Sequence, residues 1–167
     1  MMPQTGDMRV QLKLVLDCPP DAAWNALQSP GVFREVLHPL AGVEPIDPPT
    51  FPEFWPDGRT ELRITSFSGL VPLGRLTLDL ARIERDDVRI LEDRGHPDSG
   101  PLAVVTSWRH RMAVSPAADG RTLFRDRLDF SAGVAGAGIW PVLWQFWQYR
   151  GGRLKKLAPD FDKGFHR

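Results

Sequence analysis

The chain has 167 residues, of which 42% are hydrophobic and 25% are charged, and its 21 basic and 21 acidic residues cancel. This length predicts one domain, residues 1–167 with a core over about 10–158, and the balanced charge argues against a nucleic-acid partner. The single cysteine, Cys18, excludes an internal disulfide. The N-terminus has no apolar run of the secretory type, so we expect a cytoplasmic protein.

The first part of the chain predicts a strand, two short helices and a second strand. Residues 10–16 alternate between apolar and polar side chains, as in a strand with one buried face. Breaks at prolines frame short helices over residues 22–27 and 32–37. A short strand follows over residues 42–46.

A proline-rich loop over residues 47–58 contains Phe51, Phe54 and Trp55. Its prolines exclude a central strand. Because three exposed aromatic side chains would be costly, we expect the loop to fold over something apolar. It forms either a lid at the entrance of a cavity, the interpretation that we favour, or a loop packed down for stability.

Five more strands are predicted after this loop, so that the expected sheet has seven. They cover residues 60–68, 73–84, 88–93, 103–114 and 121–131. A long loop over residues 94–101, which holds His96, separates the third of these strands from the fourth.

The last two strands place a polar pair among apolar side chains. Their predicted inner faces carry Trp108, His110, Met112 and Val114, and Thr122, Phe124, Asp126 and Leu128. If Val114 pairs with Thr122, His110 faces Asp126, and a slip of two residues would break this pair. The same register sets Arg109 against Arg127 on the outer face, which is unfavourable.

Residues 135–158 predict a long helix on which the rest of the chain is organised. Trp140, Trp144 and Trp147 share one side of it, and its first half is apolar almost all round, so we expect it to be buried on more than one side. Two glycines, Gly151 and Gly152, favour a bend or break in its second half.

Two surface properties of this helix bear on partners. Its basic cluster, Arg150, Arg153, Lys155 and Lys156, is interpreted as a solvated helix end. Residues 131–149 carry no charge, but their glycines, proline and glutamines argue against a membrane-spanning helix. Trp-rich and basic segments do suit brief contact with a membrane surface during ligand exchange.

Element order and three local patterns resemble the START-like, or SRPBCC, superfamily. The patterns are P-x-x-A-W-x-x-L beginning at Pro20, F-x-D-x-L beginning at Phe124, and R-x-x-R-L-x-x-L beginning at Arg150. The resemblance covers residues 10–158 and implies an α+β helix-grip fold. In that fold a seven-stranded antiparallel sheet curves around the C-terminal helix, and a cavity between them takes an apolar or amphipathic small molecule.

The candidate site residues follow from these faces. Those expected to bind a ligand are Trp108, His110, Met112, Phe124, Asp126, Trp144, Trp147, Phe54 and Trp55. His110 and Asp126 form either a buried structural pair, a polar contact for a ligand, or a general acid and base. The four histidines have no metal-site spacing, and no phosphate loop or dinucleotide fingerprint is present, so neither a metal nor a cofactor is expected.

Three functions remain open from the sequence. The first is a binding or carrier protein for a lipid, quinone or polyketide-like aromatic. The second is an enzyme of the aromatase/cyclase kind, in which His110 and Asp126 move protons. The third is a module that binds another protein through exposed aromatic side chains.

Overall fold

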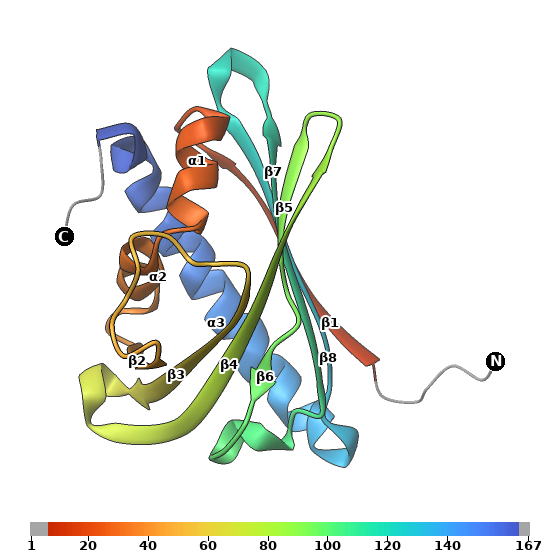
Figure 1. Cartoon of the computed structure of the whole chain (residues 1–167). Helices are drawn as coiled ribbons and strands as arrows, with labels where there is room; N and C mark the ends of the chain where they lie inside the picture. The colour runs from red at the N-terminus through yellow and green to blue at the C-terminus, as the bar shows by residue number, and fades with distance from the viewer. Residues whose placement is uncertain (1–6, 164–167) are drawn as a thin grey trace.

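The computed structural model describes residues 7–163, apart from the side chain of Ser68, and shows one twisted sheet with its helices on one side (Figure 1). The elements are β1 (Asp7–Leu16), α1 (Pro20–Leu27), α2 (Pro30–Leu37), β2 (Ala41–Asp47), β3 (Gly58–Ser66), β4 (Val71–Arg85), β5 (Val88–Asp93), β6 (His96–Pro97), β7 (Ser107–Pro116), β8 (Thr122–Ser131) and α3 (Gly136–Leu157).

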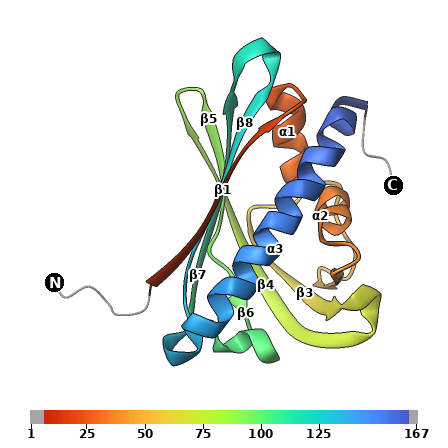
Figure 2. The same ribbon diagram turned by 180° about the vertical axis from the view of Figure 1, so that it is seen from behind.

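The sheet has the order β1-β8-β7-β5-β4-β3-β2, and all its neighbouring strands are antiparallel. α3 crosses the face that also carries α1 and α2 (Figure 2). This arrangement confirms the predicted helix-grip fold, with two short helices after the first strand. The sheet has eight strands rather than the predicted seven, because His96–Pro97 in the predicted loop pairs with β4 as β6.

The predicted register of β7 and β8 is wrong by two residues. Val114 pairs with Phe124, and His110 pairs with Leu128 rather than with Asp126. On the outer face Arg109 lies opposite Asp129 rather than Arg127, and Arg127 lies opposite Arg111 instead. The shift keeps every side chain on its predicted face, because a slip of two preserves the alternation of a strand.

The apolar first half of α3 is not enclosed, contrary to the prediction. Trp147 is 2% exposed, whereas Trp140 and Trp144 stack on each other and are 37% and 43% exposed. The sheet covers one side of α3, and the described residues leave the opposite side of its first half to solvent. Among the helices that the structure describes, none combines the length and apolarity needed to cross a membrane.

The expected break at Gly151 and Gly152 is absent, since α3 runs unbroken to Leu157. Gly151 is buried, and a Cβ atom there would lie 2.3 Å from Cδ2 of Leu12 on β1. The missing side chain therefore lets α3 approach the sheet closely. Gly152 faces open space, because a Cβ atom there would have no described neighbour within 4 Å.

These two glycines give a matched test of that close approach. We expect Gly152→Ala to raise the free energy of unfolding by about 1 kcal/mol, because alanine is the better helix former. Gly151→Ala gains the same propensity but must push Leu12 aside, an overpacking cost of about 1–3 kcal/mol. Urea denaturation followed by circular dichroism measures both variants, and equal stabilisation by both would contradict the close-packing explanation.

Candidate ligand cavity

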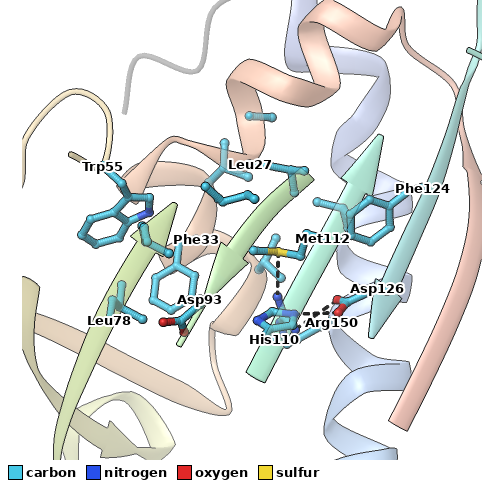
Figure 3. A pocket seen from close by; sticks show the side chains of 17 residues that line it. Leu27, Phe33, Trp55, Leu78, Asp93, His110, Met112, Phe124, Asp126 and Arg150 are labelled. Atoms are coloured by element: carbon cyan, nitrogen blue, oxygen red, sulfur yellow. Dashed lines mark hydrogen bonds and ion pairs between the residues drawn. The ribbon is translucent and has the colours of Figure 1, made fainter. Parts of the chain in front are cut away.

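Two adjoining cavities of about 260 Å³ and 60 Å³ lie between the sheet and the helices. Five residues line both of them: Phe33, Leu78, Asp93, His110 and Arg150. We call the three polar members, Asp93, His110 and Arg150, the polar neck. Figure 3 shows the polar neck in the smaller cavity, whose other walls are apolar apart from Asp126. The other walls of the larger cavity are apolar, so a ligand there meets its charged and titratable groups at the neck.

The polar neck is organised by Asp126, which lies on β8 and is 3% exposed. Its Oδ1 is 2.6 Å from Nε2 of His110 and accepts a hydrogen bond of 2.9 Å from Nε1 of Trp147. Its Oδ2 accepts a bond of 3.3 Å from Nη1 of Arg150. The carboxylate thus joins β7 and α3 through three donors.

The predicted pair of His110 and Asp126 is therefore present, although the predicted register is wrong. The two side chains meet diagonally across β7 and β8, a distance that long side chains span. The slip of two residues was expected to break this pair, but the pair persists. Trp147 and Arg150 reach the same carboxylate.

The charge state of Asp126 follows from these contacts. Burial alone would raise the pKa of its carboxyl, but the electrostatic attraction of His110 and Arg150 and the hydrogen bonds of His110 and Trp147 outweigh it. The net effect lowers the pKa of Asp126, which stays a carboxylate at neutral pH. The Arg150 guanidinium also lies 4.8 Å from the centre of the Trp147 ring, a cation–π contact.

The prediction that the basic cluster is a solvated helix end is wrong for Arg150. Its side chain is only 11% exposed and lines both cavities. Arg153 also turns back onto the protein and donates to the carbonyl oxygen of Glu35 on α2. The spacing of three residues from Trp147 to Arg150 was the available signal, because it places both on one face of a helix.

Asp93 is a site residue that the sequence analysis missed. It lies at the end of β5, is 3% exposed, and its Cα pairs directly with that of His110 on β7. Its Oδ1 accepts hydrogen bonds from the backbone N–H groups of Asp79 at 2.9 Å and Gly95 at 2.8 Å. The sequence held one clue to this position. Asp93 lies two residues after Leu91, and residues two apart in a strand point to the same face, here the inner one.

The electrostatics of Asp93 are opposite to those of Asp126. Burial raises the pKa of the Asp93 carboxyl, and its two backbone hydrogen bonds and the nearby His110 and Trp108 only partly offset this. The buried Nε1 of Trp108 is close enough to act on this carboxyl, yet it has no hydrogen bond of normal geometry among the described residues. Asp93 therefore favours its neutral, protonated form more strongly than an ordinary aspartate does.

Most of the other predicted ligand contacts line a cavity. Met112, Phe124 and Trp55 line the smaller one, and Trp108 and Trp147 line the larger one. Phe54 and Trp144 line neither and are 46% and 43% exposed. They point away because neighbouring positions on the loop and on α3 face the core instead.

The favoured interpretation of residues 47–58 as a lid is not supported. Trp55 is 3% exposed and receives edge-on contacts from Phe33 and Phe51. Its backbone N–H donates to the carbonyl oxygen of Gln28, and its own carbonyl oxygen accepts from Arg82. These bonds hold the loop down as part of the smaller cavity's wall.

Within the described residues, no three His, Cys, Asp or Glu side chains are grouped so that they could hold a metal ion. The polar side chains of the two cavities are one carboxylate, one buried carboxyl with a raised pKa, one imidazole and one guanidinium.

The comparisons agree with the architecture. No family model matches the sequence, and no curated protein matches it. A norcoclaurine synthase from Thalictrum flavum is 15% identical with a TM-score of 0.65, covering 96% of this chain and 99% of its own. The Zhui aromatase/cyclase from Streptomyces sp. R1128 is 12% identical with a TM-score of 0.64, covering 92% and 94%. Ara h 8.0201 is 13% identical with a TM-score of 0.62, covering 93% and 99%.

At these identities the likeness concerns the fold. The protein shares the helix-grip fold of these structures over nearly its whole length.

Replacing Asp126 tests whether it organises the polar neck. We expect Asp126→Asn to lower the free energy of unfolding by about 3–5 kcal/mol at neutral pH, because Arg150 loses its buried counter-charge and His110 loses its charged hydrogen-bond partner. The pKa of Asp126 is lowered on folding. The stability that the Asp126 carboxylate contributes is therefore complete above about pH 4, and it is lost as the pH falls through the lowered pKa. Urea unfolding of both proteins across this pH range measures the difference.

The matched control is Asp129→Asn, on the outer face of the same strand. Asp129 pairs with Arg9 and Arg127 at the surface, so we expect a change within about 1 kcal/mol. Similar small losses for both variants would contradict the organising role of Asp126.

Proposed function

We propose that this protein is a cytoplasmic binding or carrier protein for a neutral, largely apolar small molecule with one oxygen-bearing polar group. The apolar body of the ligand occupies the larger cavity, and its oxygen lies at the polar neck. The observation that carries the proposal is the meeting of Asp93, His110 and Arg150 at the junction of two otherwise apolar cavities.

The walls of the larger cavity support an apolar ligand. They are built from aliphatic and aromatic side chains of the sheet, α2, α3 and the segment before β7, such as Leu76, Phe146 and Val105. Two lining residues, Leu40 and Val142, are themselves exposed, so this cavity reaches the surface beside the first half of α3. A ligand can therefore enter there without unfolding of the core.

The charge balance of the cavity supports a neutral ligand. Arg150 is the one lysine or arginine among the described residues lining the two cavities, and Asp126 already neutralises it. Asp93 adds a second carboxyl group and no positive charge. A fatty acid or another carboxylate would thus lack a free counter-charge.

One structural neighbour contains a molecule of this ligand class. A norcoclaurine synthase structure from Thalictrum flavum holds dopamine and hydroxybenzaldehyde, and the second of these is a small, neutral aromatic carbonyl compound. The protein-binding alternative has less support, because Trp55, one of its expected exposed aromatics, is buried.

A matched series of naphthalene derivatives tests the ligand class. We expect 2-acetonaphthone, a neutral ketone, to bind about tenfold more tightly than naphthalene, because its oxygen accepts a hydrogen bond at the polar neck. The carboxylate 2-naphthoate should bind no better than naphthalene, because its charge lacks a partner. Titration of the protein's tryptophan fluorescence measures all three affinities.

Two variants of β4 show whether binding occurs in the larger cavity. Leu76→Trp fills the cavity and should abolish binding of 2-acetonaphthone, whereas Ala81→Trp on the exposed outer face should leave it unchanged. If 2-naphthoate binds most tightly, or if both variants behave alike, the proposed ligand class or its location is wrong.

A further inference from the structure

The polar neck brings an acidic and a basic group directly opposite each other. Asp93 and His110 are Cα partners on the neighbouring strands β5 and β7, so their side chains leave the same face of the sheet side by side. Both line both cavities, and Figure 3 shows them in the smaller one. A ligand at the neck therefore touches both groups at once.

His110 is oriented as a base. Its Nε2 is hydrogen-bonded to the Asp126 carboxylate, which can accept a hydrogen bond but cannot donate one, so Nε2 carries the ring hydrogen. In the neutral imidazole the lone pair then lies on Nδ1. No hydrogen bond to Nδ1 is found among the described residues, which leaves this atom to a ligand.

Asp93 is oriented as an acid. Its Oδ1 is occupied by the backbone N–H groups of Asp79 and Gly95, and these donors fix the plane of the carboxyl group. The proton of the neutral acid therefore belongs on Oδ2, which can donate it to a ligand oxygen. The buried, unsatisfied N–H of Trp108 is close to this carboxyl and offers a second donor for the same oxygen.

We propose that the polar neck is an acid–base centre that interconverts a bound ketone or aldehyde with its enol. This inference rests on the proposed function and names the substrate class as an enolisable carbonyl compound. Nδ1 of His110 removes a proton from the carbon next to the carbonyl group, and that C–H electron pair becomes the C=C bond of the enol. The carbonyl oxygen takes the proton of Asp93, and the reverse step restores all groups, so neither an oxidant nor a co-reactant is needed.

The geometry suits this reaction for two reasons. The carbonyl oxygen and the neighbouring carbon of a ketone are separated by one atom, which matches two groups that lie side by side on paired strands. The apolar walls limit access of water, so the hydrogen bonds at the developing enol oxygen are stronger than in solution.

Hydrogen–deuterium exchange of 2-acetonaphthone measures this activity. In deuterated buffer, enolisation replaces the methyl hydrogens with deuterium, and proton NMR follows their loss. We expect the protein to accelerate the exchange about tenfold or more over buffer alone. With the ketone at saturating concentration, we expect Asp93→Asn and His110→Gln each to remove most of that acceleration.

The variants are chosen to keep the surrounding structure. In Asp93→Asn the new amide retains an oxygen for the two backbone N–H groups, and in His110→Gln the new amide nitrogen can still donate to Asp126. Neither replacement exchanges a proton as its parent side chain does. Asp129→Asn, on the outer face, should leave the exchange rate unchanged.

The outcomes separate this inference from the function on which it rests. Binding of 2-acetonaphthone without faster exchange, or exchange that survives both substitutions, would overturn the acid–base centre and leave the binding function standing. Failure of the ketone to bind in the fluorescence titration would overturn both.

Discussion

The structure depends on one buried carboxylate. Asp126 is the point at which β7 and α3 are tied to β8, through His110, Trp147 and Arg150. A buried aspartate without partners would become protonated or destabilise the fold, whereas three donors keep it charged. The same three donors are thereby fixed in place. The orientation of the helix, the charge balance of the cavity and the free nitrogen of His110 all follow from this contact.

The cavity combines two opposite environments for carboxyl groups. Asp126 is held by charged and polar donors, which lower its pKa, while burial dominates at Asp93 and raises its pKa. Groups with pKa values pushed apart in one site are the usual arrangement where one acts as an acid and another supports a base. Here the imidazole of His110 lies between them, bonded to Asp126 and paired through its strand with Asp93.

Much of the fold could be predicted from the sequence, because alternation and proline breaks report which face of each strand is buried. Asp126 and His110 were found by this parity alone. Contacts between elements were less accessible: alternation is unchanged by a slip of two residues, so it could not fix the β7–β8 register. Arg150 and Asp93 were missed because charged side chains usually face water, and only the packing of α3 on the sheet shows that these two do not. Gly151 likewise favours a break by its low helix propensity. The structure shows instead that a glycine fits there because Leu12 on β1 leaves no space for a side chain.

The central claim is that Asp126 holds the proton of His110 on Nε2 and leaves Nδ1 to a ligand. Long-range proton–nitrogen NMR of the histidine side chains measures this directly. We predict that the neutral His110 ring shows a protonated Nε2 and a bare Nδ1, and that the Nδ1 signal shifts when a neutral ketone binds. A neutral ring protonated on Nδ1, or an Nδ1 signal that ignores a bound ketone, would contradict it.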